Sequence, residues 1–310
     1  MRKVLITPRS FAKYNRDEVL VLFQQHGIEP VFNPYNEIMT EEQLKEALTE
    51  MDGLIVGVDP VTEAVINHAP NLKAIAKYGV GIDNIDAPAA ESRNIKVSRT
   101  VGANSASVAD YSFALLMAVA RRVVDIHNGC KNDDWSKKIA LDVFGKKIGV
   151  LGLGAIGRGM VKRAQGFDME VYGYDIFKDE DYIRENNIQF VDIETMVKEC
   201  DFISIHMPLT DETHHMFDKP LLETAKANLV IINTARGGIV DEDALYELIK
   251  DGKIYGAGID AFEQEPARDS KLLTLENVVV GSHTAASSIG ATEQMTLMAA
   301  QNIIKDLEVN

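Results

Sequence analysis

The chain has 310 residues, which is long for one domain but sufficient for two domains that each bury a hydrophobic core. Apolar residues make up 46% of the sequence and charged residues 25%, the ordinary balance of a globular protein. The formal net charge is −15, from 32 Lys and Arg against 47 Asp and Glu. This balance argues against an indiscriminate nucleic-acid binder and against a protein that binds anionic membranes.

The N-terminus and the cysteines bear on the compartment. The sequence MRKVLIT begins a strand at once rather than a signal peptide, and no apolar run approaches membrane-spanning length. Cys130 and Cys200 lie far apart without the spacing of metal ligands, so they indicate neither a disulfide framework nor a zinc site. We therefore expect a cytoplasmic protein.

Short Val- and Ile-rich runs alternate with helical patterns through the first hundred residues. This alternation is typical of parallel strands joined by right-handed crossovers. The stretch 105–129 then interrupts the alternation as one long helix, whose wide apolar face we expect to pack against a neighbouring domain or another subunit. The predicted strands are residues 3–7, 30–33, 53–57, 72–77 and 95–98, and the predicted helices are residues 17–27, 40–50 and 62–69.

A second alternating series follows the long helix. Together the two series predict an α/β protein with two doubly wound parallel-sheet domains and a cleft between them. The predicted strands are residues 146–154, 169–175, 201–206, 228–235, 253–260 and 277–283, and the predicted helices are residues 155–167, 193–199, 241–250 and 289–310.

The most specific local pattern is the sequence KKIGVLGLGAIGRGM. Gly152, Gly154 and Gly157 form G-x-G-x-x-G directly after a strand and at the start of a helix, the context in which this motif binds a dinucleotide. The next strand ends at Asp175, where a carboxylate can accept both ribose hydroxyls. Isoleucine and phenylalanine follow it, with no arginine placed to hold a 2′-phosphate, so the pattern favours NAD over NADP. The alternative is a glycine-rich turn that binds nothing.

Three chemically active side chains fall at the ends of later strands: Arg236, Glu265 and His283. In open α/β sheets the carboxyl ends of strands face the crevice that holds the ligand. An arginine there can bind a carboxylate bidentately, and a histidine can exchange a proton near neutral pH. A glutamate beside that histidine favours its protonated form and fixes its tautomer. With NAD, this set specifies hydride transfer at a carbon next to a carboxylate.

Each of these residues alone has an ordinary structural explanation. A single arginine at a strand end is usually a surface ion pair, and a single histidine there is commonly a capping residue. Their coincidence beside the glycine motif favours the functional interpretation. His214 and His215 are adjacent but lack two further ligands nearby, so we predict no metal site and interpret both as exposed loop residues.

Over essentially its whole length the chain resembles the D-isomer-specific 2-hydroxyacid dehydrogenases, and among them most closely the phosphoglycerate dehydrogenases. The resemblance is carried by YGVGIDNID, VLGLGAIGRGM, HMPLTDETHHMF, INTARGGIVDEDAL, DAFEQEP and SHTAAS, in the family's order and spacing. It implies that Arg236 holds the substrate carboxylate and carbonyl, while His283, paired with Glu265, exchanges the hydroxyl proton. It also implies a flavodoxin-like substrate domain, residues 1–98 plus 287–310, and a Rossmann NAD-binding domain, residues 99–286.

The resemblance further implies binding roles at matching positions. The backbone amides of a glycine-rich loop that begins after Tyr78 would receive the substrate carboxylate, as such loops bind anions. Asp260 would lie near the nicotinamide. The implied substrate contacts are Tyr78, Gly79, Val80 and Gly81, and the further implied cofactor contacts are Ala155, Ile156, Met207, Pro208, Thr234 and Ala235.

Substrate choice and partners are less specified. Phosphoglycerate dehydrogenases often carry an arginine where this chain has Lys77, and Arg9 is a second cation that could reach a phosphate. Both could equally be surface charges. The resemblance implies a homodimer, which the helical region 105–127 would help to build. The chain ends directly after its last predicted helix, so we expect no feedback inhibition by serine through a C-terminal regulatory module.

The expected activity is therefore NAD-dependent oxidation of 3-phosphoglycerate in serine synthesis. Within the same enzyme class the alternative is a glyoxylate or hydroxypyruvate reductase, or another D-2-hydroxyacid dehydrogenase. From a different class, an NAD(H)-sensing corepressor-like binding protein shares the implied fold, although the acidic balance disfavours it.

Overall fold

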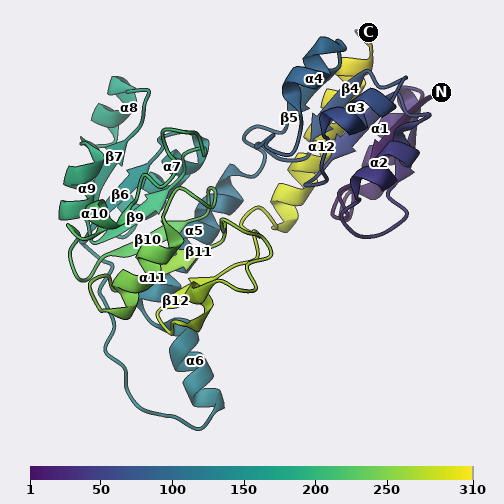
Figure 1. Ribbon diagram of the computed structural model, residues 1–310. Coiled ribbons are helices and arrows are strands. Elements are labelled where there is room, and N and C mark those ends of the chain that lie inside the picture. Colours follow the sequence, from purple (N-terminus) through teal and green to yellow (C-terminus); the bar gives the residue numbers. More distant parts are fainter. Residues whose placement is uncertain (309–310) are drawn as a thin grey trace. The chain divides into compact units, whose positions relative to one another are not determined.

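The computed structural model describes residues 1–308, and the chain divides into two compact units (Figure 1). The first unit is Met1–Asn104 together with the segment that begins at Ser287, and the second is Ser105–Ala286. The first unit extends beyond the expected limit at residue 98 because Thr100 pairs with the glycine loop. The Thr100 N–H donates to the Gly79 carbonyl at 3.0 Å, and the Gly79 N–H donates to Thr100 Oγ1 at 2.9 Å.

The first unit contains a five-stranded parallel sheet in the order β2-β1-β3-β4-β5. This is the flavodoxin-like order of a doubly wound sheet, as predicted. The strands are β1 Arg2–Ile6, β2 Ile28–Phe32, β3 Gly53–Val56, β4 Ala74–Lys77 and β5 Lys96–Arg99, and the helices are α1 Arg16–Gln25, α2 Glu41–Leu48, α3 Glu63–His68, α4 Ala87–Ser92 and α12 Ile289–Glu308.

The register of this sheet determines which loops meet. Ile6 pairs with Ile55, and Val56 pairs with Lys77, so the segments after β1, β3 and β4 leave the sheet at the same carboxyl edge. β3 and β4 are buried along their whole length, which is why their sequences are nearly continuous apolar runs. Local signals begin the helices: the Thr40 side chain accepts the Gln43 N–H in a capping box at the start of α2.

The second unit contains a seven-stranded parallel sheet in the order β12-β11-β10-β9-β6-β7-β8. Counted from β6, this is the Rossmann order with one further strand, as predicted. The strands are β6 Lys147–Leu151, β7 Glu170–Tyr174, β8 Gln189–Phe190, β9 Phe202–Ile205, β10 Val230–Asn233, β11 Gly256–Ile259 and β12 Val278–Val280. The helices are α5 Ser105–Ala120, α6 Val123–Lys131, α7 Ala155–Gln165, α8 Glu180–Glu185, α9 Ile193–Glu199, α10 Lys219–Leu222 and α11 Glu242–Lys250, with a 3₁₀ helix at Lys271–Thr274.

The strand ends of this sheet are also in register. Leu151 pairs with Tyr174 and with Ile205, and Ile259 pairs with Asn233 and with Val280. The segments that follow six of the strands therefore leave along one carboxyl edge. They begin at Gly152, Asp175, His206, Thr234, Asp260 and Gly281.

The prediction of a single helix over residues 105–129 is wrong. Helix α5 ends at Ala120, and Arg122 adopts a left-handed conformation with φ of 52° before α6 begins. The apolar face of α5 packs against α7, β10 and β11 of its own unit, with Leu116 fully buried, whereas α6 has no buried residue. The apolar face of α5 is therefore covered by its own unit.

The structure also contains short elements that the sequence did not predict. These are α4, α8, α10, β8 and the 3₁₀ helix, none longer than six residues. Such short segments carry too little hydrophobic periodicity to be recognised. Within residues 1–308 none of the helices has the length and apolarity that a membrane span requires.

Candidate active site

The G-x-G-x-x-G loop has the close contacts that require glycine. A Cβ at Gly157 would lie 1.8 Å from the Gly152 carbonyl oxygen, so only glycine permits this approach of α7 to the strand. Gly152 has φ of 86°, and a Cβ there would lie 2.6 Å from the His206 carbonyl oxygen. Gly154 differs: it is the N-cap of α7, no side chain caps it, and a Cβ there would meet nothing within 4 Å.

These features fit the pyrophosphate of NAD. The first N–H groups of α7 carry the partial positive charge of a helix N-terminus, and the open space at Gly154 gives an anion access to them. Met207 lines the same turn, since a Cβ at Gly152 would lie 3.2 Å from Met207 Cγ, and Pro208 next to it is exposed. The neighbouring cofactor candidates Ala155 and Ile156 form the first turn of α7.

Asp175 lies at the end of β7 beside the glycine loop. Its Oδ2 accepts the Leu153 N–H at 2.6 Å, and its Oδ1 accepts the Phe177 N–H at 2.9 Å. The nearby cation Arg158 donates to the Leu153 carbonyl at 3.0 Å and pairs with Asp179 at 2.6 Å, while its guanidinium lies over the Tyr182 ring. A carboxylate next to the loop and an arginine held by another partner both favour a free ribose hydroxyl over a 2′-phosphate.

Arg236 follows β10 on a segment that its own sequence holds in place. Asn233 is buried, donates to the Arg236 carbonyl at 2.8 Å and accepts the Ala235 N–H at 3.1 Å. Thr234 shares a hydrogen bond of 2.7 Å with Ser112 on α5. The Arg236 guanidinium donates to the Ala235 carbonyl at 2.7 Å. These contacts fix the backbone from which the guanidinium extends.

Glu265 and His283 are in direct contact, although 18 residues separate them. The two carboxylate oxygens lie 3.0 and 2.9 Å from His283 Nδ1, and Glu265 Oε1 also accepts the Phe262 N–H at 3.0 Å. Both side chains remain partly exposed, at 46% for His283 and 38% for Glu265. A carboxylate at Nδ1 fixes the ring tautomer and leaves Nε2 as the nitrogen that can exchange a proton with a bound molecule.

Asp260 organises the turn that carries His283. Its carboxylate is 1% exposed and accepts the N–H groups of Thr284 at 3.0 Å and Ala285 at 2.8 Å, while its carbonyl accepts the His283 N–H at 2.9 Å. His283 itself has φ of 56°, a conformation that non-glycine residues rarely adopt. Three hydrogen bonds to one buried aspartate thus hold the histidine backbone in this unusual geometry.

Two histidines differ from what the sequence suggested. His215 was interpreted as an exposed loop residue, but it is half-buried: its Nε2 lies 3.0 Å from Glu263, and its ring stacks on His214. His206 was not singled out, yet it follows β9 at the carboxyl edge, with Nε2 2.8 Å from Ser204 Oγ. Burial lowers the pKa of His206 to about 4, so the ring is neutral at physiological pH although part of the residue remains exposed.

In the first unit, Lys77 connects the end of β4 to neighbouring segments through hydrogen bonds. This lysine is only 6% exposed, and its ammonium donates to the Gly57 carbonyl at 2.5 Å and to Asn84 Oδ1 at 2.6 Å. Asn84 in turn donates to the carbonyls of Gly57 and Asp59. Lys77 therefore joins the segments after β3 and β4 and is not the surface charge that the sequence left open.

The remaining candidates of the first unit lie at the same edge. The Tyr78 hydroxyl donates to the Thr292 carbonyl on α12 at 3.1 Å, and Gly79 has φ of 141°. Val80 and Gly81 are partly buried members of the loop, whereas Arg9, three residues beyond β1, is exposed.

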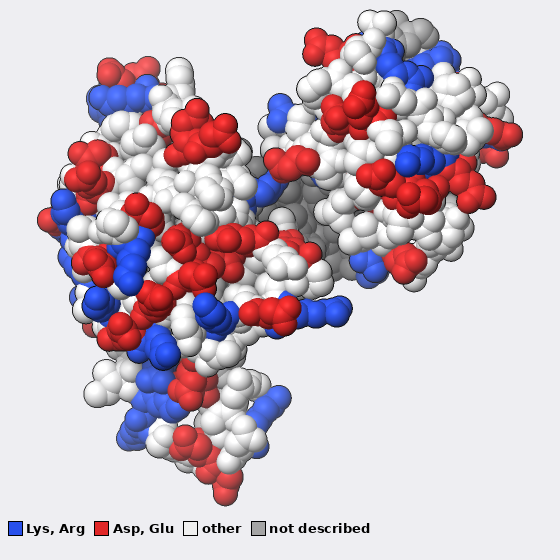
Figure 2. Space-filling model, viewed as in Figure 1, with Lys and Arg blue, Asp and Glu red and all other residues white. Residues whose placement is uncertain are grey.

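Two other kinds of site, a cationic surface and a metal centre, can be compared with the described part of the chain. On the face drawn in Figure 2, acidic and basic side chains are interspersed and no broad cationic area gathers. Within residues 1–308 no group of three or more His, Cys, Asp or Glu side chains is arranged to hold a metal ion.

Comparison with known proteins identifies the family. Residues 113–285, more than half of the chain, match the family model described as D-isomer specific 2-hydroxyacid dehydrogenase, NAD binding domain. A glyoxylate reductase from Korarchaeum cryptofilum is 40% identical over 267 residues, which are 84% of this chain and 80% of the relative. A D-3-phosphoglycerate dehydrogenase from Methanocaldococcus jannaschii is also 40% identical, over 87% of this chain and 52% of the relative.

A solved structure agrees with this assignment. The crystal structure of D-lactate dehydrogenase from Aquifex aeolicus, complexed with NAD and lactic acid, matches 96% of this chain and 93% of its own with a TM-score of 0.83 and 27% identity. The sheet orders, the glycine loop and the sequence similarity lead to the same conclusion. The chain belongs to the D-isomer-specific 2-hydroxyacid dehydrogenases, NAD-dependent oxidoreductases that act on the hydroxyl group of 2-hydroxy acids.

Proposed function

We propose that the protein reduces a small, unphosphorylated 2-keto acid such as glyoxylate or hydroxypyruvate. The observation that carries this choice is Lys77. It occupies the position expected to meet a phosphate, but its buried ammonium donates to Gly57 and Asn84 of its own unit. Two of the three donors of this ammonium are already used within its own unit, and the residue is buried, which favours a substrate that needs no phosphate ligand here.

In this proposal Arg236, Glu265 and His283 carry the reaction. Arg236 binds the carboxylate and the neighbouring carbonyl oxygen, because its planar guanidinium can donate to two oxygens at once. Glu265 holds His283 Nδ1 at 2.9 Å, so the proton leaves from Nε2. Bound NADH supplies the hydride to the carbonyl carbon. His283 Nε2 delivers a proton to the carbonyl oxygen, which becomes the hydroxyl group of the product.

The cofactor roles follow from the second unit. Gly152, Gly154 and Gly157 shape the loop that receives the pyrophosphate, and Asp175 accepts the ribose hydroxyls. Asp260 holds the turn that follows β12 near the nicotinamide end. Further proposed contacts at matching positions are Ala155, Ile156, Met207, Pro208, Thr234 and Ala235. In the first unit, the amides of Gly79, Val80 and Gly81 would receive the substrate carboxylate beside Tyr78.

A second candidate is oxidation of 3-phosphoglycerate, as in serine synthesis. The exposed side chain of Arg9, at the same carboxyl edge as the loop after β4, favours it, because an arginine can bind a phosphate bidentately without disturbing the Lys77 contacts. A relative named D-3-phosphoglycerate dehydrogenase is as similar to this chain as the relative named glyoxylate reductase.

We also propose that the protein is a cytoplasmic homodimer, built through α6 and the segment after it. Trp135 is 76% exposed and Ile139 is 94% exposed, and large apolar side chains in such positions mark an interaction surface. The free thiols of Cys130 and Cys200 fit a reducing compartment. Replacement of Trp135 by aspartate should convert a dimer to a monomer in light scattering, whereas a wild-type monomer would refute this part.

The test of substrate class is steady-state kinetics with three acids. We would measure kcat/KM for glyoxylate and hydroxypyruvate with NADH, and for 3-phosphoglycerate with NAD at alkaline pH. Efficient turnover of the unphosphorylated acids, unchanged by Arg9→Ala, supports the first candidate. A much higher kcat/KM for the phosphorylated acid, lost in Arg9→Ala, supports the second. Turnover of none of the three contradicts both.

A further inference from the structure

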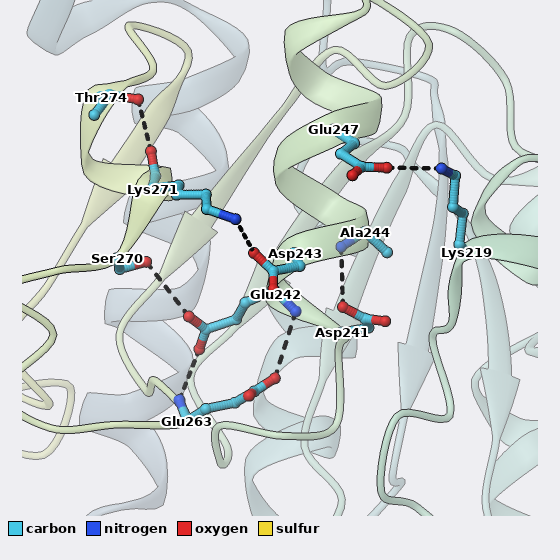
Figure 3. Close-up of polar contacts among 10 residues, drawn as sticks. All are labelled: Lys219, Asp241, Glu242, Asp243, Ala244, Glu247, Glu263, Ser270, Lys271 and Thr274. Carbon is cyan, nitrogen blue, oxygen red and sulfur yellow. Dashed lines mark hydrogen bonds and ion pairs between the residues drawn. The ribbon is translucent and has the colours of Figure 1, made fainter.

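Two glutamates outside the proposed catalytic set exchange reciprocal hydrogen bonds in the second unit (Figure 3). Glu242 Oε1 accepts the Glu263 N–H at 2.7 Å, and Glu263 Oε1 accepts the Glu242 N–H at 3.4 Å. Two anchors hold the pair from either side. Ser270 Oγ donates to Glu242 Oε2 at 3.4 Å. His215 Nε2 lies 3.0 Å from Glu263 Oε1. We call Glu242, Glu263 and His215 the glutamate latch.

The latch joins the two segments that carry Arg236 and Glu265. Glu242 begins α11, six residues after Arg236, and Glu263 lies two residues before Glu265. The same segments are in close contact at Gly237, where a Cβ would lie 1.9 Å from the Phe262 carbonyl carbon. His215 adds a third segment, since its N–H donates to the Gly238 carbonyl at 2.6 Å.

The environment of Glu242 disfavours its charged form. Burial and the nearby Glu263 and Asp243 raise the pKa of Glu242, while the Glu263 N–H and Ser270 act in the opposite direction. The local cation Lys271 does not neutralise the pair, because its ammonium contacts Asp243 at 2.8 Å (Figure 3). Each carboxylate accepts the backbone N–H of the other glutamate, so the pair fixes the two backbone segments relative to each other.

We propose that Glu242 is a positioning residue that fixes the Glu265 segment against the Arg236 segment through Glu263. This inference rests on the proposed function, in which Glu265 orients His283. Glu265 Oε1 is tied to its own segment by the Phe262 N–H, so a shift of residues 262–263 moves the carboxylate away from His283 Nδ1. The glycine loop and Asp175 follow other strands, so the latch should act on proton transfer more than on binding of the pyrophosphate and the ribose.

The test compares Glu242→Ala with Glu242→Gln and a control. Alanine removes both acceptors, whereas glutamine keeps an amide oxygen for the Glu263 N–H. The control is Asp243→Asn, an exposed carboxylate in the same helical turn that faces Lys271 (Figure 3). We would measure kcat, KM for glyoxylate, the Kd of NADH by fluorescence, and the pH profile of kcat for each variant.

We expect Glu242→Ala to lower kcat about 10- to 100-fold, since a displacement of about 1 Å in a catalytic group costs on that order. The pH profile of kcat should change as well, because the Glu265 carboxylate no longer lies against His283 Nδ1. The Kd of NADH should stay within about threefold of wild type. Glu242→Gln should recover most of kcat, and Asp243→Asn should behave as wild type.

Other outcomes separate the latch from the proposed function. If Glu242→Ala binds NADH normally and keeps the wild-type kcat and pH profile while His283→Asn is inactive, the catalytic proposal stands and the latch is refuted. Equal losses in Glu242→Ala and Glu242→Gln would also refute it, because the amide oxygen should restore the contact. Full activity of His283→Asn would instead overturn the proposed function itself. If Glu242→Ala does not fold, Glu242→Gln and Glu263→Gln are compared with wild type instead. Each keeps an acceptor for the N–H of the other residue, so a large loss of kcat in either would refute the latch.

Discussion

Replacement of Gly237 by alanine should separate the segments of Arg236 and Glu265. A Cβ at this position would lie 1.9 Å from the Phe262 carbonyl carbon, 2.0 Å from its oxygen and 2.2 Å from the Glu263 nitrogen. Real Cβ atoms stay at least 3.0 Å from such atoms, so the two backbones must move apart by about 1 Å. Gly237 does not have a positive φ, so the effect is steric and not conformational.

The magnitude follows from how strongly catalysis depends on geometry. A displacement of about 1 Å between catalytic groups costs about 100-fold in rate, so kcat/KM for glyoxylate should fall by about that factor. The Kd of NADH should change less than kcat/KM, because the glycine loop and Asp175 follow other strands. The matched control is Gly290→Ala on α12, where a Cβ would meet nothing within 4 Å. A folded Gly237→Ala protein with kcat/KM within about twofold of wild type would refute the argument.

Three further predictions concern cofactor choice, the substrate loop and stability. Asp175→Asn should raise KM for NADH about 10-fold and improve use of NADPH, because it removes the charge that repels a 2′-phosphate; unchanged discrimination in steady-state kinetics would contradict this. Lys77→Met should raise KM for glyoxylate about 10-fold without changing KM for NADH, because Gly57 and Asn84 lose their donor. An effect confined to 3-phosphoglycerate would instead place the ammonium at a phosphate. The pKa of His206 falls from 6.5 to about 4 on folding, so the unfolded chain takes up its proton first as pH falls. Its contribution to stability, about 3 kcal/mol at most, is present above pH 6.5 and lost toward pH 4. In calorimetry, the Tm of His206→Gln should therefore fall less over that range than the Tm of wild type. Equal falls would contradict this prediction.

Much of the fold could be predicted because it rests on strong, local patterns. The central strands of both parallel sheets are buried on both faces and therefore appear as nearly continuous apolar runs. Their alternation with helices leaves few possible topologies. Gly152 and Gly157 are recognisable because backbone contact forces glycine at both positions, and Gly154 because the motif's spacing places it at the N-cap of α7. The break between α5 and α6 was missed because Arg122 adopts a left-handed conformation that nothing in its residue type announces.

The residues of the candidate site could be proposed from the sequence, but the hydrogen bonds that hold most of them in place could not. The contact of Glu265 with His283 could be anticipated because both follow strands that end at one edge. The partners of Lys77 could not, because the lysine and the carbonyl of Gly57 meet only through the register of β3 with β4. Glu242 and Glu263 resemble any other surface carboxylates in sequence, and only the close approach at Gly237 brings their backbones together. The roles of the catalytic and cofactor residues remain predictions.

The measurement that tests the central claim most directly is NADH-dependent reduction of glyoxylate and hydroxypyruvate by wild type and His283→Asn, with NADH binding followed in parallel. The account predicts turnover by wild type and a loss of at least about 100-fold in kcat for the variant at unchanged NADH affinity, because His283 Nε2 supplies the proton. A variant that binds NADH and reduces either acid at the wild-type rate would contradict it.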